Sequence, residues 1–328
     1  MKFTVLIPLY NKAPYIRCTL ESVLAQNFKD YEILVIDDGS TDGGDKIVEA
    51  MVDDTIRLIR QANAGVSAAR NQGISEARGD WVSFLDADDW QHPDFLAALV
   101  LAQAAYPEAQ AAGTDFLRFP HAEGSWPPRW LIPSGPPDIE RIADLPSRWM
   151  QGPSLCSSAV AVRRDLLQSM QPCFPLGEAM GEDLDLWFRL AEKTPIALVR
   201  VPLAAYRVTV AGSLTAQQTP SNAPPFIRRI RDRAMSGLMT PAQRRSALWL
   251  VAQHEVSVAR LAVMTGQRLS GLRCLIRGRR AARGRRWWLT LAMTLFMPNQ
   301  VVSRWESWRI RRGNPTAQLT QAGSIYET

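Results

Sequence analysis

The sequence predicts an α/β fold, with a mostly parallel central sheet flanked by helices and a basic helical extension after it. Three observations predict it. Apolar runs rich in β-branched residues alternate with segments of helical spacing over residues 1–106, which is typical of a parallel sheet wound by helices. Polar residues follow each expected strand. The charge also changes sign, because residues 1–224 carry 19 basic and 28 acidic side chains whereas residues 225–328 carry 19 and 4.

Four strands and four helices are expected in the first third of the chain. Each apolar run precedes a segment in which apolar residues recur every three or four positions. The expected strands are residues 3–9, 31–36, 55–61 and 80–85, and the expected helices are residues 14–26, 43–52, 64–77 and 92–106. Pro93 near the start of the fourth helix suits a first helical turn.

The second third of the chain has a weaker pattern. Residues 107–155 are rich in Pro and Trp and are expected to be irregular, as a surface loop or flap. Beyond them, residues 157–167 are expected as a strand entering a helix, residues 181–194 as a helix and residues 196–208 as a strand. The Pro-rich stretch at 219–226, where the charge changes sign, is the expected domain boundary.

Composition excludes several classes of protein. The four cysteines form no Cys-x-x-Cys pair, which argues against a zinc ribbon or a disulfide framework and fits a reducing compartment. The three histidines are far apart, which disfavours a histidine-built metal site. No stretch of about 18 apolar residues exists, so no transmembrane helix is predicted. The N-terminal apolar run lacks a cleavage site and is expected to be a strand.

Polar side chains follow all four expected strands. Asn11 follows the first, Asp37 and Asp38 the second, Asn63 the third, and the run Asp86–Asp89 the fourth. Because the carboxyl ends of parallel strands share one edge of a sheet, these side chains are expected to gather there. Ligands bind at this edge in doubly wound sheets, so the sequence predicts a binding site rather than isolated motifs.

The acidic run "DADD" has two interpretations. Paired carboxylates on a tight turn can chelate a hard cation that also binds diphosphate oxygens. Alternatively, the run is a solvated turn in which Asp89 caps the following helix. An EF-hand loop is excluded, because its sixth and twelfth positions would hold Gln91 and Ala97 instead of Gly and Glu.

The other polar motifs each have a structural alternative. "IDDGSTDGG" is composed of ordinary turn formers, yet an Asp here can accept a hydrogen bond from a nucleotide base or ribose. "NAGVSAARNQG" permits close backbone approach to an anionic ligand, or simply close helix packing. "GEDLD" supplies carboxylates for a general base, or an acidic helix N-terminus favoured by the helix dipole.

In order and spacing, "VLIPLYN", "DDGSTD", "NAGVSAARNQG", "FLDADD" and "GEDLDLWFRL" together resemble family 2 glycosyltransferases over about residues 3–214. The resemblance implies a GT-A fold, a Rossmann-like sandwich. It implies a catalytic domain at 1–218, with a nucleotide-sugar-binding half at 1–106 and an acceptor-binding half at 107–218, before a basic, mainly helical region at 219–328. It also implies inverting transfer from a nucleoside diphosphate sugar, with Mg²⁺ or Mn²⁺ as cofactor.

The resemblance assigns the donor-binding residues. Pro8, Tyr10 and Asp38 are expected to line the nucleoside pocket. Asn63, Gly65 and Arg70 are expected to flank the base, ribose or diphosphate.

The resemblance also assigns the metal site and the general base. Asp86 and Asp88 form the Asp-x-Asp element, with Asp88 as the direct metal ligand and Asp86 nearer the ribose and the metal shell. Asp183, the second acid of the Glu-Asp pair, is the expected general base. Thr209 stands where many relatives have a histidine, and Arg207 or Ser213 is expected to replace it at the diphosphate.

The expected activity is non-processive transfer to a hydroxyl of a glycan or lipid-linked acceptor in cell-surface polysaccharide biosynthesis, with a UDP-sugar as the favoured donor. "QVVSRW" at 300–305 has one residue too many for the Q-x-x-R-W motif of processive members. The alternative is a non-catalytic sugar-nucleotide-binding or assembly module of a glycan synthesis complex. A dehydrogenase is disfavoured, because no G-x-G-x-x-G follows the first strand.

The basic tail sets arginines before an eleven-residue apolar run that begins with two tryptophans. Such a helix reaches about 16 Å, roughly half the hydrocarbon core, so it is too short to span a bilayer. Peripheral binding to an anionic membrane is the favoured role, at the inner, cytoplasmic face of the cell membrane. Packing on the catalytic core or on a second subunit is the alternative, so a homo-oligomer is left open. Nucleic acid is not expected as a partner.

Overall fold

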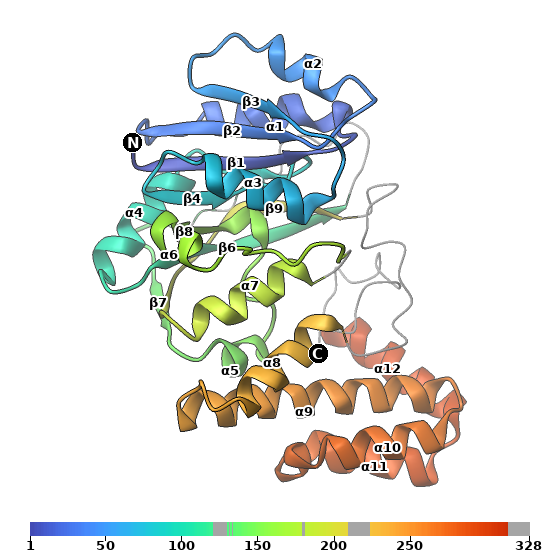
Figure 1. The fold of residues 1–328 in the computed structure, drawn as a ribbon. Helices are drawn as coiled ribbons and strands as arrows, with labels where there is room; N and C mark the ends of the chain where they lie inside the picture. Colours follow the sequence, from blue (N-terminus) through green and yellow to red (C-terminus); the bar gives the residue numbers. More distant parts are fainter. Residues whose placement is uncertain (121–129, 131, 133, 179–180, 209–223, 314–328) are drawn as a thin grey trace. The chain divides into compact units, whose positions relative to one another are not determined.

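The computed structural model describes residues 1–120, 130, 132, 134–178, 181–208 and 224–313 (Figure 1). They belong to two compact units. The first unit is Met1–Ala143 with Ser154–Val210, and the second is Asp144–Pro153 with Ala211–Thr328. The second unit therefore takes in a short segment from the middle of the chain as well as the basic C-terminal region.

The first unit begins with the alternating strands and helices that the sequence predicts. They are β1 (Phe3–Leu9), α1 (Ala13–Leu24), β2 (Tyr31–Asp37), α2 (Gly44–Glu49), β3 (Ile56–Arg60), α3 (Val66–Glu76) and β4 (Trp81–Phe84). These four strands are parallel and lie in the order β3-β2-β1-β4. The parallel register brings the loops after β1, β2, β3 and β4 to one edge of the sheet, as expected.

The remaining strands extend this sheet in the order β4-β8-β6-β9-β5, with β7 pairing β9. The elements are β5 (Trp90–Gln91), α4 (Phe95–Ala105), β6 (Ala111–Pro120), β7 (Ile139–Ile142), η1 (Ser157–Ala159), β8 (Val160–Arg163), α6 (Arg164–Ser169), α7 (Glu182–Ala191) and β9 (Ile196–Val208). Strand β8 is antiparallel to both β4 and β6. The predicted α/β fold class, a central sheet flanked by helices, is confirmed.

The expectation that residues 107–155 are irregular is wrong for much of that segment. Strand β6 lies inside the sheet, between β8 and β9, and β7 pairs β9 at Ile139–Ile142. The sequence "AAGTDFLRFP" begins with small residues of low strand propensity, so its pattern does not indicate a strand. Pairing with strands distant in sequence decides its structure.

The core of the first unit explains why its helices lie flat on the sheet. Strand residues Val5, Ile7 and Leu9 are fully buried, as are Ile16 and Leu20 of α1. Strands with nearly continuous apolar residues are typical of a sheet that is covered on both faces.

The small residues of α3 serve close packing at one position. A Cβ placed on Gly73 would lie 2.1 Å from Leu6 Cδ1, so any larger residue there would force the buried Leu6 side chain or α3 to move. One of the two interpretations of "NAGVSAARNQG" is therefore realised at Gly73.

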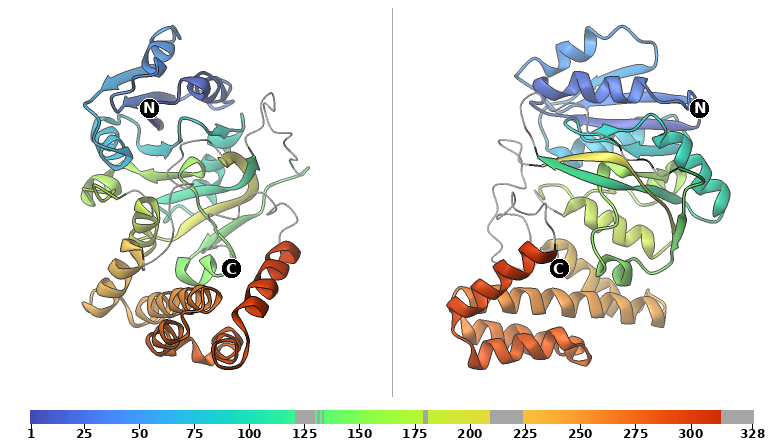
Figure 2. Two further views of the ribbon diagram at one scale, coloured as in Figure 1. Left: turned by 90° about the vertical axis from the view of Figure 1, so that its right-hand side faces the viewer. Right: turned by 180° about the vertical axis from the view of Figure 1, so that it is seen from behind.

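The second unit is helical in its described part. Its helices are α5 (Leu145–Trp149), α8 (Pro225–Met235), α9 (Pro241–Met264), α10 (Arg268–Arg277), η3 (Arg279–Arg283), α11 (Arg285–Phe296) and α12 (Asn299–Gly313). A capping box between Thr240 and Gln243 begins the 24-residue α9, around which the other helices pack (Figure 2). Among the described residues, no helix combines the length and apolar character needed to cross a bilayer.

Candidate active site

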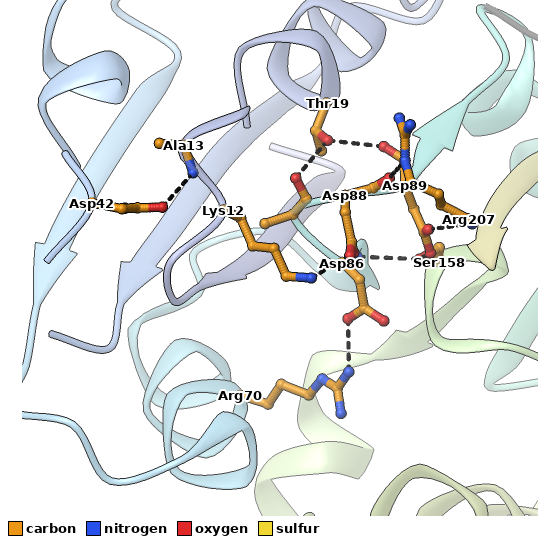
Figure 3. Close-up of polar contacts among 11 residues, drawn as sticks. Lys12, Ala13, Thr19, Asp42, Arg70, Asp86, Asp88, Asp89, Ser158 and Arg207 are labelled. Carbon is orange, nitrogen blue, oxygen red and sulfur yellow. Dashed lines mark hydrogen bonds and ion pairs between the residues drawn. The ribbon is translucent and has the colours of Figure 1, made fainter. Parts of the chain in front are cut away.

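Polar contacts join the loops after β1 and β2. Asn11 has a left-handed φ of 51°, which Asn tolerates better than most residues. Its side-chain oxygen accepts a hydrogen bond from the Thr41 backbone N–H at 2.9 Å. The Asp42 carboxylate accepts one from the Ala13 N–H at 2.8 Å (Figure 3). The "DGSTD" turn therefore fixes the path of the chain into α1.

Asp38 fixes the third loop of the same edge. Its carboxylate accepts hydrogen bonds from the backbone N–H groups of Ala64 and Gly65, both at 2.8 Å, and from the Gln61 side chain. Asp38 is buried. In this structure it acts first as a clamp on the loop between β3 and α3, which carries the exposed Asn63 and Gly65.

The remaining nucleoside candidates lie at the end of β1. Pro8 is half-buried within the strand, and Tyr10, just after it, is 49% exposed. An exposed aromatic ring is suited to stack on a planar base. The five candidates therefore come from the ends of β1, β2 and β3, on one edge of the sheet.

The acidic turn after β4 separates its three carboxylates. The Asp86 carboxylate accepts a hydrogen bond from Arg70, the Asp88 carboxylate contacts Lys12, and the Asp89 carboxylate contacts Ser158 (Figure 3). Each carboxylate thus has a partner of its own, and this offsets the repulsion expected of three like charges within four positions.

Asp89 is fully buried under the turn. Its Oδ2 accepts a hydrogen bond from Ser158 Oγ at 2.5 Å and its Oδ1 accepts one from the Arg207 backbone N–H at 2.8 Å. Burial, with the charges of Asp88 and Asp86 added, raises the pKa of Asp89 well above its usual range. The alternative in which Asp89 caps the next helix is wrong, because Asp94 directly precedes α4.

Ser158→Ala should destabilise the protein by about 1–3 kcal/mol. Ser158 Oγ donates to Asp89 and accepts from the Asp86 backbone N–H at 3.1 Å, so the change leaves two groups without this partner. Urea unfolding measures the loss. Ser75→Ala is the control, because Ser75 is exposed and bonds only within its own helix. Equal stability of the two variants would contradict the role of Ser158.

Lys12 contacts Asp88 at the acidic turn. Its Nζ lies 2.5 Å from Asp88 Oδ2, and both side chains retain partial exposure, 24% and 15%. Lys12 directly precedes α1, so it comes from the loop after the neighbouring strand β1. The Lys12 ammonium therefore contacts one oxygen of the carboxylate that the family resemblance assigns to a metal.

Arg70 joins the acidic turn to the N-terminus of α7. It is 4% exposed and donates to Asp86 Oδ1 at 2.7 Å and to Glu182 Oε1 at 2.8 Å. Its guanidinium also lies 5.2 Å from the centre of the Phe174 ring. Burial lowers the pKa of Arg70, but the charges of Asp86 and Glu182 outweigh it and raise the pKa, so the cation is held firmly.

Asp183 follows Glu182 in the first turn of α7. Its Oδ1 accepts a hydrogen bond from the Leu184 N–H at 2.7 Å, and Ser157 Oγ lies 3.5 Å from its Oδ2. Burial and the neighbouring Glu182 charge raise the pKa of Asp183 to about 7, although Arg70 opposes the shift. A carboxyl group with a pKa near neutrality is suited to accept a proton during a reaction.

Arg207 lies behind the acidic turn among aromatic rings. Its guanidinium carbon is 4.8 Å from the centre of the Tyr15 ring, 5.0 Å from that of Trp90 and 5.1 Å from that of Phe119. Its Nε donates to the Asp88 carbonyl at 2.8 Å, and the residue is buried. These contacts make Arg207 a support of the turn's backbone.

The carboxylates at this turn suit a hard divalent cation whose coordination shell is completed by a substrate. Asp86 and Asp88 offer carboxylate oxygens and are 28% and 15% exposed. In the described part of the chain, no group of three or more His, Cys, Asp or Glu side chains is arranged to hold an ion. Magnesium sites of this kind take one or two carboxylates and complete their shell with phosphates and water.

Three contacts at this site were not anticipated from sequence. Lys12 follows the first strand, so the same edge argument would have found it. Ser158 and the bridging role of Glu182 carry no local signal, since their partners are 69 and 112 positions away. Thr209, which stands where many relatives have a histidine, and Ser213, one of its two expected replacements at the diphosphate, lie outside the described residues.

Residues 4–170 match the family described as Glycosyl transferase family 2. The glycosyltransferase GlyA of Streptococcus pneumoniae serotype 4 is 39% identical over 125 residues, which are 38% of this chain and 18% of GlyA. The matched stretches cover only 18–29% of the lengths of three curated relatives.

Two solved structures share the fold. TarS 1–349 of S. aureus, in complex with UDP-GlcNAc, is 19% identical with a TM-score of 0.68, over 94% of this chain and 92% of that chain. The mannosyltransferase PcManGT of Pyrobaculum calidifontis, in complex with GDP-Man and Mn²⁺, is 18% identical with a TM-score of 0.59, over 99% of this chain and 84% of that chain.

Proposed function

The chain belongs to glycosyl transferase family 2, and on that premise we propose that it transfers a sugar from a nucleoside diphosphate sugar to a hydroxyl group, with inversion at the anomeric carbon. One observation carries the proposal. Arg70 connects a partly exposed acidic turn to the helix that begins with Glu182 and Asp183. The site thus holds carboxylates that can bind a cation, and through it the diphosphate of a donor, beside a carboxylate that is poised to accept a proton.

The donor is proposed to bind along the edge formed by the loops after β1, β2 and β3. Tyr10 and Pro8 form one side of the nucleoside pocket, and the loop with Asn63 and Gly65 forms the other. Asp38 holds that loop through the N–H groups of Ala64 and Gly65. Nucleotide-sugars in the complexes of TarS and PcManGT support this class of donor, and we favour a UDP-sugar.

The proposed metal is Mg²⁺ or Mn²⁺, held by Asp88 with Asp86 beside it. Such a cation supplies neutralisation of the charge that builds on the departing diphosphate. Mn²⁺ in the complex of PcManGT supports the choice. Arg70 orients the Asp86 carboxylate through the 2.7 Å hydrogen bond. Arg207, assigned to the donor from sequence, is proposed to act through the Asp88 backbone instead of touching the diphosphate directly.

Asp183 is proposed to take the proton from the acceptor hydroxyl. The oxygen then attacks the anomeric carbon on the face opposite the diphosphate, the new C–O bond forms, and the diphosphate leaves with the bonding electron pair. A base with a pKa of about 7 is about half ionised at pH 7 and retains the basicity needed to take a proton. Asp86 and Arg70 hold the base and the donor-binding region in fixed positions relative to each other.

The proposed biological role is non-processive transfer to a glycan or lipid-linked acceptor in cell-surface polysaccharide biosynthesis, at the cytoplasmic face of the membrane. The similarity to the glycosyltransferase GlyA and the UDP-GlcNAc in the complex of TarS support sugar transfer and are consistent with this role. The acceptor half is proposed to include β6, β7 and α7.

A panel of nucleoside diphosphate sugars tests the function. Incubation with Mn²⁺ should release nucleoside diphosphate from one donor class, and release should accelerate with an acceptor present. Binding of a donor, measured by thermal shift, without release from any member of the panel would instead favour a non-catalytic sugar-nucleotide-binding module.

Lys12→Met should strengthen binding of Mn²⁺ by roughly tenfold in the presence of a nucleoside diphosphate. The ammonium of Lys12 competes with a cation for Asp88 Oδ2, and its removal frees that oxygen. Isothermal titration with Mn²⁺ measures the change. Lys29→Met, an exposed lysine outside this site, is the control. Unchanged or weaker Mn²⁺ binding in Lys12→Met would show that Lys12 does not compete.

A further inference from the structure

The second unit exposes a row of large apolar side chains on α10 and α11. Six of them are between 41% and 80% exposed: Leu269, Ile276, Trp288, Leu289, Leu295 and Phe296. We call this set, with the arginines around it, the α10–α11 face. Scattered single apolar residues on a surface are ordinary, but six on two adjoining helices are not.

The two helices run antiparallel beside α9. Arg268 near the start of α10 donates to the Thr294 carbonyl near the end of α11, and the Trp287 indole N–H at the start of α11 donates to the Leu275 carbonyl. Figure 2 shows α10 and α11 packed beside each other against α9, in agreement with their contacts. The two helices are therefore neighbours in the second unit, and each has an exposed outer side.

The side chains divide cleanly between the two sides of each helix. In α11, Thr290, Met293 and Thr294 are buried, whereas Trp288 and Leu295, seven positions apart, lie on the opposite side. Positions seven apart share a helix face. The same spacing separates Leu289 from Phe296 and Leu269 from Ile276. The apolar residues thus point away from the packed interior of the unit.

The charge around this face has one sign. Residues 256–305 contain ten arginines and no Asp, Glu or Lys. Exposed members at and near the turn between the helices are Arg273, Arg279, Arg280, Arg283 and Arg285. Glu255, directly before this stretch, is paired with Arg277. The arginines at the turn therefore supply positive charge that the neighbouring sequence does not neutralise.

We propose that the α10–α11 face docks on an anionic phospholipid surface. Trp, Leu and Phe side chains enter the interfacial region of a bilayer, with tryptophan preferred at headgroup depth. Arginine guanidinium groups pair with lipid phosphates, often through two hydrogen bonds. The face combines both components, and α11, with 12 residues, lies along such a surface instead of crossing it.

Two other occupants fit less well. In a symmetric dimer the same surface meets itself, which would bring the arginines of two copies together without acidic partners. Nucleic acid would satisfy the arginines but would leave Leu269, Ile276 and Phe296 without an apolar partner. Both are outcomes of the test below.

The full chain should sediment with vesicles of phosphatidylcholine and phosphatidylglycerol and much less with phosphatidylcholine alone. Binding should weaken as salt rises, because the Debye length shortens. The double variant Trp288→Glu, Phe296→Glu should bind the anionic vesicles roughly a hundredfold more weakly. The triple variant Arg279→Gln, Arg280→Gln, Arg283→Gln should lose a similar factor.

Leu238→Glu is the matched control, because Leu238 is 86% exposed in the same unit but lies between α8 and α9. It should bind vesicles as wild type does. Circular dichroism and thermal melting establish that all variants are folded, and quenching of wild-type tryptophan fluorescence by brominated anionic lipid gives a readout that needs no variant. The quenching should weaken in Trp288→Phe.

Three results would overturn the proposal. One is equal binding of wild type and both face variants to anionic vesicles. Another is a dimer in sedimentation velocity that Trp288→Glu dissociates, with no vesicle binding. The third is tight binding to duplex DNA without vesicle binding. The readout is vesicle binding rather than sugar transfer, so its failure would remove the proposed membrane location but not the proposed transfer reaction.

Discussion

Asp183→Asn should lower kcat for sugar transfer by roughly 10²–10⁴-fold and leave binding of the nucleoside diphosphate sugar nearly unchanged. The amide keeps the shape of the side chain and its acceptor oxygen for the Leu184 N–H, but it cannot take up a proton. Donor binding is measured by titration and turnover by product release. Near-normal turnover would remove Asp183 as the base, and an equal loss of donor affinity would assign it to binding.

The same residue predicts a pH dependence of kcat. The pKa of Asp183 is raised to about 7 by burial and by the Glu182 charge. Its protonated form cannot accept a proton from the acceptor, so kcat should rise with pH and reach half its maximum near pH 7. The residual activity of Asp183→Asn should not show this rise. A wild-type profile that is flat between pH 5 and 8 would contradict the assignment.

The raised pKa also has a consequence for stability. The folded state holds the proton of Asp183 at pH values where the unfolded chain releases it, so this group's contribution to stability falls as pH rises from the ordinary Asp range to about 7. Asp183→Asn should therefore melt at a higher temperature than wild type above pH 7. Asp165→Asn is the control, because Asp165 is exposed, its pKa is lowered by Arg163, and its loss should not raise the melting temperature.

The position of the site can be predicted from sequence because it depends on the alternation of strands and helices. Four apolar runs separated by helical segments imply a shared edge, and Asp38, Asp86 and Asp88 stand at the ends of their strands. This inference needs only the period of the pattern and the geometry of parallel strands. It holds even though single motifs such as "IDDGSTD" carry little information alone.

The contacts within the site were less accessible, because they join residues distant in sequence. Ser158 reaches Asp89 across 69 positions, and the Arg207 backbone reaches it across 118. No local pattern in "SSAVAV" or "AAYRV" marks these contacts. The family resemblance also predicts a ligand role for Arg207, as a replacement at the diphosphate for the histidine that many relatives have. Three aromatic rings around its guanidinium turn the side chain to the interior.

Strand β6 failed as a sequence prediction for a related reason. Its first residues, "AAGT", are too small to show a strand pattern, yet Gly113 is required there. A Cβ at Gly113 would lie 2.8 Å from the Ala159 carbonyl oxygen, so the close approach of β6 to its neighbour selects the residue. The close contact within the sheet requires a small residue here, and small residues weaken the strand pattern in the sequence.

Arg70→Met should destabilise the protein by roughly 3–5 kcal/mol, because it leaves two carboxylates facing each other without their shared cation. The value should fall toward the lower end, since Asp86 is 28% exposed whereas Glu182 is 11% exposed. Urea unfolding measures the change. Arg60→Met is the matched control: Arg60 also pairs with two carboxylates, those of Asp45 and Glu49, but at the surface, so its loss should cost under about 1 kcal/mol.

The triple variant Arg70→Met, Asp86→Asn, Glu182→Gln separates stability from chemistry. It removes the unpaired charges, so most of the lost stability should return, but transfer should not, because Asp86 is a proposed metal residue. Arg70 also opposes the rise in the pKa of Asp183. In Arg70→Met the pH at which kcat is half-maximal should therefore move upward. An unchanged profile would show that Arg70 holds the two parts of the site together without tuning the base.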